Sequence, residues 1–290
     1  MELLKRIFDW FLNAILIVAA LIGVWIIVQV FLFCSFKIPS DSMEPTLEPG
    51  DYVLVNKLLI GPRLFDLSKA LNGKNVTIYR LPGLHSIQRN DVLVFHFPHP
   101  YTWEKIEMHL LKYYVKRCIG LPGDSVWIRG GYYQISQQTD TFGNIAAQQR
   151  LSKMSPEAFP ENVYPAFPFD SVLAWNIQYF GPLYLPKAGD EIPLDRTNYL
   201  LYKKAIEWEQ QAELSYRDSV VYLNQKPLAC YRFRKNYYFM CGDHTENSQD
   251  SRYWGLLPEE YIVGKAWKIW KSVDPYTEEF RWERFLKSIK

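Results

Sequence analysis

The apolar residues form one long uninterrupted run near the N-terminus and only short runs after it. Residues 11–36 read FLNAILIVAALIGVWIIVQVFLFCSF and contain no charged side chain. About 20 consecutive apolar residues are enough for a helix that spans a bilayer. Asn13 and Gln29 stand toward the two ends of the run. The run therefore predicts a transmembrane anchor over residues 11–36, preceded by a short segment, residues 1–10.

A cleavable signal peptide is the alternative interpretation of this run. Its apolar region would span only about 7–15 residues and would lead to an Ala-x-Ala-like site, which the residues after the run do not contain. Lys5 and Arg6 precede the run, whereas only Lys37 follows it closely. Positive charge favours the cytoplasmic side of a membrane. We therefore expect a retained single-pass anchor, with residues 1–10 in the cytoplasm and the chain beyond the anchor outside.

After the anchor, short β-type runs each follow a turn signal. These runs lie at residues 52–55, 92–95 and 126–128 and at Ile192, after turns at 49–51, 89–91, 122–124 and 188–190. A turn followed by a short run of β-branched and aromatic residues is typical of antiparallel strands. The pattern predicts a mainly β protein whose core comprises residues 37–130 and 219–275.

Residues 131–218 differ in character from this core. They contain a Gln/Ser/Thr-rich patch at 134–149, a Pro/Phe-rich patch at 154–169 and a helix-compatible run at 197–216. Strand signals resume at 220–223, and a turn is expected at 224–227. The sequence thus predicts an inserted α+β subdomain over residues 131–218.

Composition narrows the class of function. Lys and Arg number 33 and Asp and Glu 31 among the 290 residues, so the chain shows no nucleic-acid footprint. The aromatic share is 16%, and large flat side chains suit β-sheet cores, apolar clefts and membrane interfaces. Four cysteines are too few for a disulfide scaffold. We therefore expect one or two β-rich domains near lipid.

Two serines stand one residue apart soon after the anchor. Ser40 and Ser42 lie between Pro39 and Pro45. Proline fixes its own φ and favours an extended residue before it, which predicts a stiff, extended backbone. Such a segment can present a nucleophile, but a serine hydroxyl is inert until a base takes its proton. A plain linker that leaves the membrane is the alternative.

A lysine stands within an apolar run that is predicted to be a strand. Alternation along this strand places Lys116 on one face with Tyr114 and Cys118, while Arg117 points the other way. Burial favours the neutral amine and lowers the pKa of a lysine, which makes it a general base. The alternative is a side chain that reaches solvent at a sheet edge.

A dense polar stretch, CGDHTENSQDSRYWG, occupies residues 241–255 between two apolar segments. Hydroxyls, carboxylates and an arginine packed this closely suit a hydrogen-bonded network that orients another group. A solvated loop is the alternative.

In this order behind an N-terminal anchor, the three stretches resemble the motifs of type I signal peptidases, the membrane-bound Ser/Lys endopeptidases. Residues 39–47 (PSDSMEPTL) resemble the nucleophile motif, 116–124 (KRCIGLPGD) the base motif and 242–255 the final motif, and 91–95 match a family strand. Three ordered motifs are a far stronger signal than any one of them. The resemblance implies an antiparallel β catalytic domain on a transmembrane helix, which cleaves signal peptides from translocated preproteins.

The resemblance also implies roles for the matching residues. Ser42 would be the nucleophile and Lys116 the general base. The Ser42 backbone N–H and the Ser40 hydroxyl would form the oxyanion hole. The supporting residues would be Ser248, which holds the lysine amine, and Asp250 with Arg252, which brace the loop as a salt-bridged pair. No cofactor or metal is implied.

The family also implies partners and a location. Partners would be signal-peptide-bearing preproteins and the lipid bilayer, with no nucleic acid. The chain would lie in the cytoplasmic (inner) membrane, with its catalytic domain on the exoplasmic or periplasmic side. In place of the family's usual Gly-Asp-Asn-Arg-Asp-Asn, the final motif here has His244, Thr245 and Glu246 after Gly-Asp. We expect this departure to affect the rigidity of the loop rather than its chemistry.

Three other interpretations stay open at this stage. A Ser-His-Asp hydrolase could use His244, although no G-x-S-x-G elbow surrounds either serine. A non-catalytic membrane-anchored β scaffold could bind secreted chains, but an inactive relative is expected to lack Ser42 or Lys116. His96 and His99 could ligate zinc, but they lack carboxylate support and are interpreted as surface residues.

Two further expectations concern the C-terminal part of the chain. A two-residue turn at Lys235-Asn236 would place Cys230 opposite Cys241, close enough for a disulfide in the oxidising space outside the membrane. A one-residue shift of register would separate the sulfur atoms. Residues 276–290 would form an amphipathic helix with a basic face, suited either to an anionic membrane surface or to the β core of the domain.

Overall fold

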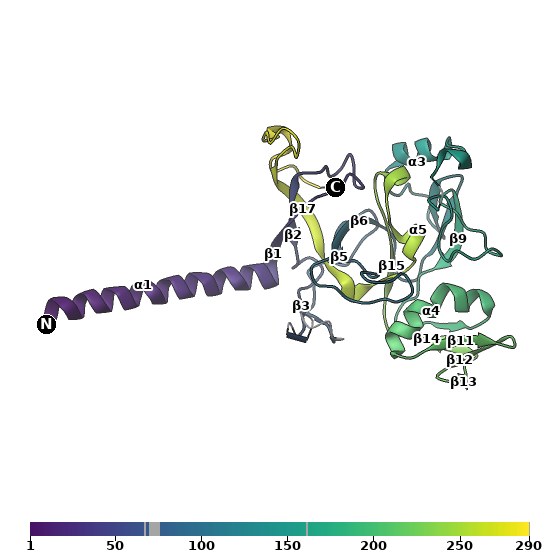
Figure 1. Ribbon diagram of the computed structural model, residues 1–290, viewed down its shortest axis with the longest axis horizontal. Helices are drawn as coiled ribbons and strands as arrows, with labels where there is room; N and C mark the ends of the chain where they lie inside the picture. Colours follow the sequence, from purple (N-terminus) through teal and green to yellow (C-terminus); the bar gives the residue numbers. More distant parts are fainter. Residues whose placement is uncertain (67, 70–75, 161, 290) are drawn as a thin grey trace.

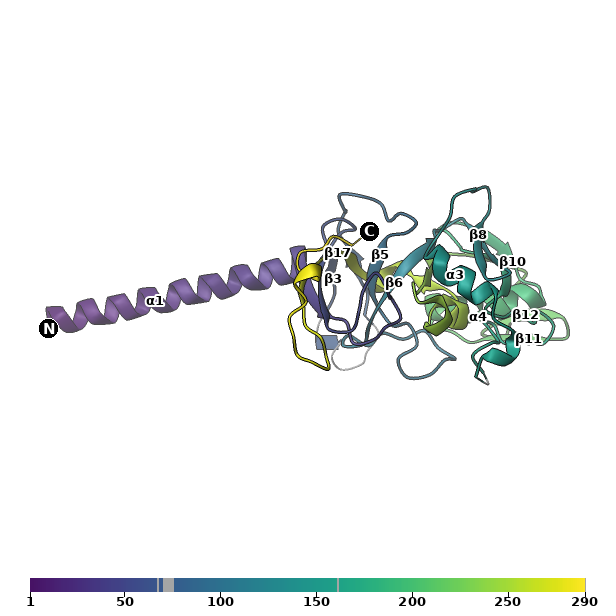
Figure 2. The same ribbon diagram turned by 90° about the horizontal axis from the view of Figure 1, so that it is seen from above.

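The computed structural model describes residues 1–66, 68–69, 76–160 and 162–289. An apolar helix, α1 (Glu2–Ile27), projects from a β-rich body and continues into a π-helical turn, Val28–Leu32 (Figures 1 and 2). Glu2–Leu32 is the one helix in these ranges that is long and apolar enough to cross a membrane. The predicted anchor is therefore present as a candidate span, and it begins earlier than residue 11.

The C-terminal end of the predicted anchor is wrong, because Phe33–Lys37 form the strand β1. The strand pairs antiparallel with β2 (Asp51–Asn56), with Phe33 opposite Asn56 and Lys37 opposite Tyr52. Hydrophobicity alone does not separate a membrane helix from an adjoining strand. The Lys57 ammonium donates hydrogen bonds to the carbonyls of Gln29 (2.7 Å) and Val30 (3.3 Å) at the end of the helix.

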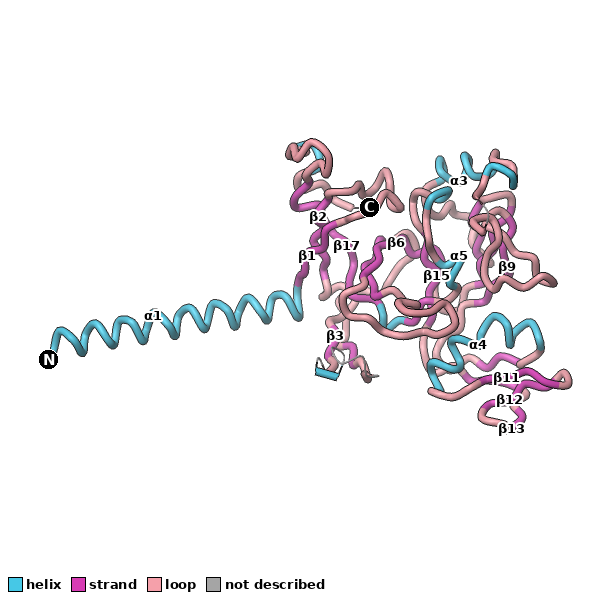
Figure 3. Tube along the Cα trace, viewed as in Figure 1, coloured by secondary structure: helices cyan, strands magenta, loops and turns pink. Residues whose placement is uncertain are grey.

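The main sheet is antiparallel throughout, as the turn-then-strand pattern predicts. Its seven strands follow the order β1-β2-β17-β5-β6-β15-β16, and they curl across the centre of the body (Figure 3). The remaining strands of this sheet are β17 (Ile262–Ser272), β5 (Val92–His96), β6 (Tyr113–Gly120), β15 (Tyr237–Cys241) and β16 (Leu257–Pro258). The mainly β fold class is confirmed.

Smaller sheets and short helices surround this sheet. The strands are β3 (Arg63–Leu64) with β4 (Tyr79–Arg80), β7 (Ser125–Arg129) with β8 (Tyr132–Ile135) and β9 (Tyr179–Tyr184), β10 (Glu191–Pro193) with β14 (Cys230–Arg232), and β11 (Leu214–Arg217) with β12 (Val220–Leu223) and β13 (Lys226–Pro227). The helices are α3 (Ile145–Ser152), α4 (Arg196–Gln210) and α5 (Ser251–Trp254). Short 3₁₀ turns occur at Pro156–Ala158, Thr245–Asn247, Glu259–Tyr261 and Trp282–Arg284.

Strands pair across both predicted borders of the insertion. β7, before residue 131, pairs with β8 and β9, and β12 and β14, after residue 218, pair with β11 and β10. The helix expected at 197–216 ends at Gln210, because Gln211 takes a left-handed φ of 50°. The residues after that cap form β11, so the helix expectation is wrong at its C-terminal end. The division into domains stays a prediction.

The expected disulfide is wrong. Cys230 lies opposite Pro193 on β14 and β10, whereas Cys241 lies opposite Arg117 on β15 and β6. Both cysteines are free. The two arms of the expected hairpin join different sheets, because each finds a partner strand elsewhere in the chain. Asn236, expected at the centre of the turn, instead accepts a hydrogen bond from the Ala188 N–H (2.9 Å).

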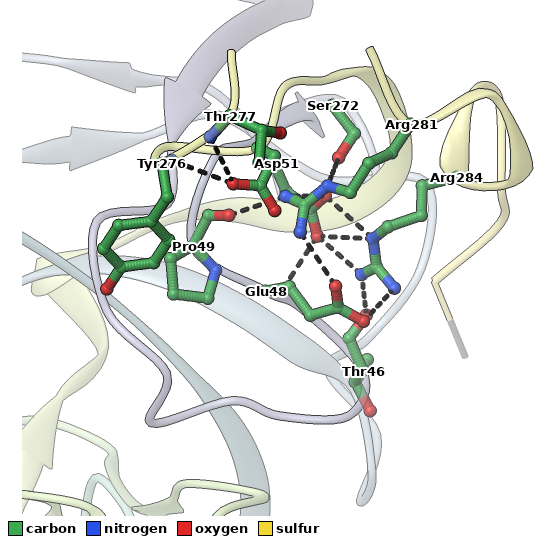
Figure 4. Close-up of polar contacts among 10 residues, drawn as sticks. Thr46, Glu48, Pro49, Asp51, Ser272, Tyr276, Thr277, Arg281 and Arg284 are labelled. Carbon is green, nitrogen blue, oxygen red and sulfur yellow. Dashed lines mark hydrogen bonds and ion pairs between the residues drawn. The ribbon is translucent and has the colours of Figure 1, made fainter. Parts of the chain in front are cut away.

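The expected C-terminal helix is also wrong. Apart from the 3₁₀ turn Trp282–Arg284, the segment from 276 to 289 folds back along β17 with isolated bridges, such as Lys268 to Ser288. Arg281 and Arg284 point inward, toward Glu48 and Asp51 (Figure 4). The buried Asp51 and the partly exposed Glu48 bind these two arginines, and a helical pattern in the sequence does not reveal such distant partners. Trp282 and Phe285 stay exposed, and contact with a membrane stays a prediction.

Candidate active site

The segment that bears the two serines is folded, not extended. Residues 40–47, called the Ser42 turn below, form consecutive turns in which the Glu44 N–H donates to the Asp41 carbonyl (2.9 Å) and the Leu47 N–H to the Met43 carbonyl (2.9 Å). Met43 and Leu47 are fully buried in the core cluster that also holds Val53 of β2. The expectation of an extended backbone is wrong, because these apolar side chains draw the segment back onto the sheet.

Strand β6 brings Lys116 directly to this turn. Lys116 lies on β6 opposite Leu93 of β5, and only 3% of it is exposed. Its amine is in hydrogen-bonding contact with the Ser42 hydroxyl. The Ser40 hydroxyl lies 3.4 Å from the same oxygen. Residues from two distant motifs therefore meet at one serine oxygen.

Burial changes the acidity of this lysine. Removal from water disfavours the charged ammonium and lowers the pKa of Lys116 from 10.5 to about 8, with Arg252 acting in the same direction and Asp250 against it. A drop of this size increases the neutral fraction at pH 7 by roughly 300-fold. The alternative, in which the Lys116 side chain reaches solvent at a sheet edge, is wrong because the residue is buried.

Arg117 and Asp243 join the three motifs, although neither residue had a role predicted from the sequence. The Arg117 guanidinium donates to both Asp243 carboxylate oxygens (2.7 and 2.6 Å), and the Thr46 hydroxyl donates to one of them (2.5 Å). Strand β6, the final motif and the Ser42 turn therefore share one buried ion pair. The sequence pointed to this pair only through the position of both residues within the matched motifs. Alternation along the strand gave no further indication, because it points Arg117 away from Lys116.

Asp250 and Arg252 form a second ion pair, in which both side chains are fully buried. Arg252 donates to the two carboxylate oxygens of Asp250, both at 2.8 Å, and the Gly242 N–H donates to the same carboxylate (3.0 Å). Burial by itself would raise the pKa of Asp250, but Arg252 and Gly242 hold it below its usual range. The pair closes the loop that faces Lys116.

Ser248 is buried beside this loop. Its hydroxyl has no hydrogen-bond partner among the residues that the structure describes, so the expected bond to the lysine amine is not made. Gly242 leaves the space for it, since a Cβ at 242 would lie 2.1 Å from the Ser248 hydroxyl and 2.5 Å from the Ser42 carbonyl oxygen. Only glycine, which has no Cβ, allows residue 242 to lie this close to the Ser248 hydroxyl and the Ser42 carbonyl.

The histidines face groups other than the Ser42 hydroxyl. His244 Nδ1 lies 3.3 Å from the Asp41 carboxylate, and the His244 backbone N–H donates to the Ser42 carbonyl (3.2 Å). His96 and His99 are buried, contrary to the expectation of surface residues. The His96 ring lies 2.9 Å from Arg63, and burial lowers its pKa to about 3. Over the described ranges no group of three or more potential metal ligands occurs.

A β-rich body on an apolar N-terminal helix, with a serine in contact with a buried lysine, has groups suited to the chemistry of a peptidase. Comparison with known proteins narrows this class. The chain belongs to the signal peptidase family, peptidase S26, whose family model matches residues 7–271. The resemblance found in the three motifs is thereby confirmed.

Two relatives that are similar in sequence agree with this assignment. The chain is 29% identical over 262 residues to signal peptidase I of Buchnera aphidicola subsp. Schizaphis graminum, covering 88% of this chain and 73% of that protein. It is 30% identical over 258 residues to signal peptidase I of Pseudomonas fluorescens, covering 85% and 68%. A crystal structure of a signal peptidase I from Enterococcus faecalis aligns over 63% of this chain and 98% of that one, at 20% identity and a TM-score of 0.31.

Proposed function

We propose that this chain is an endopeptidase that removes N-terminal signal peptides from translocated preproteins, with Ser42 as the nucleophile and Lys116 as the general base. The observation that carries the proposal is the contact between the Ser42 hydroxyl and a lysine amine that is almost fully buried. Burial keeps a useful share of that amine neutral near pH 7. A neutral amine can accept the serine proton, whereas an ammonium cannot.

The reaction follows from this pair. Lys116 takes the proton of the Ser42 hydroxyl while the oxygen attacks the scissile carbonyl carbon. The resulting tetrahedral oxyanion would accept hydrogen bonds from the Ser42 N–H and the Ser40 hydroxyl, 3.4 Å from the nucleophile. Lys116 then returns the proton to the leaving amine, which departs as the new N-terminus. Water then attacks the acyl-enzyme while Lys116 takes its proton, and Lys116 passes that proton to the Ser42 oxygen as the ester bond breaks, which releases the signal peptide with a new C-terminal carboxyl group.

The neighbouring residues would support this pair. In our proposal the Asp250–Arg252 ion pair keeps the final loop closed over Lys116. Ser248, whose hydroxyl is buried and without a partner in the described ranges, would turn toward the amine once the proton has moved. The extended substrate would lie beside the Ser42 turn, with small side chains, typically alanine, at the first and third positions before the cut.

The proposal includes a location. Helix α1 would anchor the chain in the cytoplasmic membrane, with the N-terminus inside and the β-rich body on the exoplasmic or periplasmic side. Translocated preproteins reach that side while their signal peptides remain in the bilayer. An enzyme anchored by one helix beside the bilayer would meet the cleavage site there.

The test compares Ser42→Ala and Lys116→Ala with Lys112→Ala, a control at an exposed lysine nearby. Each full-length variant is purified in detergent and incubated with a preprotein that has alanine at the first and third positions before the cut. We expect both site variants to lose roughly 10³-fold or more of the cleavage rate while still binding the preprotein, and the control to retain it. Undiminished cleavage by Lys116→Ala would refute the Ser/Lys mechanism, and binding without cleavage by the unaltered chain would indicate a scaffold.

A further inference from the structure

The inserted segment reaches the candidate active site through its first helix. Figure 1 shows α3 beside the yellow-green loop of the final motif, and the view in Figure 2 agrees. The N-cap residue of α3, Asn144, donates a side-chain hydrogen bond to the Asp243 carbonyl (3.1 Å). The N–H of the preceding Gly143 donates to the Asn90 side chain (2.9 Å). The backbone carbonyl of Asn90 in turn accepts a hydrogen bond from Arg117 (2.7 Å). Helix α3 is thus fastened to the buried ion pair of Arg117 and Asp243.

A second contact lies toward the other end of α3. Arg150 Nε lies 2.5 Å from a carboxylate oxygen of Glu246. Glu246 is one of the residues at which the final motif departs from the usual family sequence, and its side chain is only 17% exposed. Its second carboxylate oxygen is buried and unpartnered among the described residues. An exposed ion pair contributes little, but Glu246 is mostly buried, and without Arg150 it would keep only the weaker contact with the His244 ring at 4.0 Å.

The loop held by α3 is also the loop that holds the Ser42 turn. Asn247, next to Glu246, donates to the Asp41 carboxylate (2.8 Å). The His244 N–H donates to the Ser42 carbonyl (3.2 Å), and the His244 ring faces Asp41 at 3.3 Å. Residues 244–247 therefore contact the Asp41 side chain and the Ser42 carbonyl, on either side of the Ser42 Cα.

We propose that α3 of the inserted segment positions the Ser42 turn, with Arg150 and Asn144 as positioning residues that act through residues 243–247. The proposal rests on the proposed Ser/Lys function and extends it by giving the insertion a part in catalysis. Arg150 touches neither Ser42 nor Lys116, so its effect is on the orientation of the serine. A misplacement of about 1 Å can cost up to 10²-fold in rate.

The experiment uses the full-length chain in detergent and the same alanine-containing preprotein. We expect Arg150→Ala and Asn144→Ala each to lower kcat by roughly tenfold with little change in KM, because orientation and not binding is lost. The acylation rate of Ser42 by a small active ester should fall in parallel. Gln149→Ala, at the exposed neighbour on the same helix, should match the unaltered chain. Equal thermal midpoints for all variants would separate positioning from unfolding.

Charge reversal gives a second, independent measurement. Arg150→Glu and Glu246→Arg should each lower kcat, and the double variant should recover most of the loss. A kcat within twofold of the unaltered chain for Arg150→Ala, or no recovery in the double variant, would overturn the proposal. Lys116→Ala distinguishes failure of the proposed Ser/Lys function from failure of the positioning role. If Lys116→Ala abolishes cleavage while Arg150→Ala does not slow it, only the positioning role fails.

Discussion

Replacement of Arg284 by methionine tests how the C-terminal segment supports the Ser42 turn. The Arg284 guanidinium donates to both oxygens of Asp51 (2.9 and 2.6 Å), to Glu48 (2.6 Å) and to the Thr46 carbonyl (3.1 Å) (Figure 4). The Asp51 side chain is fully buried and that of Arg284 is 5% exposed. Removing one partner of a buried ion pair typically costs about 3–5 kcal/mol, since the other charge stays buried.

The neighbouring Arg281 determines whether the loss in the free energy of unfolding lies near the lower or the upper end of this range. Its guanidinium lies 3.7 Å from Asp51 and 3.0 Å from Glu48. A cation therefore remains near Asp51 in Arg284→Met, and we expect a loss of about 3 kcal/mol in the free energy of unfolding. The double variant Arg281→Met/Arg284→Met leaves Asp51 uncompensated, and the loss should reach about 5 kcal/mol.

The assay is urea unfolding of the full-length chain in detergent micelles, followed by tryptophan fluorescence, together with the cleavage rate under native conditions. Lys287→Met is the control, because that side chain is exposed on the same segment. Cleavage by Arg284→Met should slow even where the chain is fully folded, because the Thr46 carbonyl loses its partner. A loss below about 1 kcal/mol in the free energy of unfolding lies within the range of an exposed ion pair. It would refute the interpretation that a buried ion pair between Arg284 and Asp51 holds the C-terminal segment to the Ser42 turn.

The remaining predictions concern pH and thiols. Cleavage should rise with pH as Lys116 loses its proton, reach half its maximum near pH 8 and fall roughly tenfold per pH unit well below that; a profile centred near pH 6.5 would indicate a histidine base instead. Because the folded lysine binds its proton less tightly than the ordinary value of 10.5, its contribution to stability should rise with pH between about 8 and 10.5. In native protein purified without reductant, exposed Cys230 should be alkylated and buried Cys241 only after unfolding; mass spectrometry that found the two linked would contradict the strand pairing.

Local sequence patterns were sufficient to predict the strands β5 and β6, which lie at the candidate site. Strands such as β5 and β6 are local features, since a turn signal and a short β-type run lie next to each other in the chain. The contact between Ser42 and Lys116 spans distant positions, and only the resemblance to a family indicated it. Alternation along β6 correctly placed Lys116 and Arg117 on opposite faces of the strand. Lys116 therefore contacts Ser42 while Arg117 binds Asp243.

Interactions between segments distant in the chain could not be predicted from local patterns. The apolar and basic residues from 276 onward favoured an amphipathic helix, but Arg284 finds a stronger partner in Asp51, a buried carboxylate far away in the sequence. Cys230 and Cys241 looked like opposite members of a hairpin, yet each strand is paired by a different neighbour. In both cases a tertiary partner overrode a plausible local structure.

The geometry of the Ser42 turn explains why such distant segments matter. Thr46 is held twice, since its hydroxyl donates to Asp243 (2.5 Å) and its carbonyl accepts from Arg284 (3.1 Å). Asp243 is bound by Arg117, which neighbours Lys116 on β6. The turn therefore cannot move away from Lys116 without breaking contacts that link it to β6 on one side and to the C-terminal segment on the other. A serine on a short turn with few hydrogen bonds of its own depends on such outside contacts, and the three motifs supply only part of them.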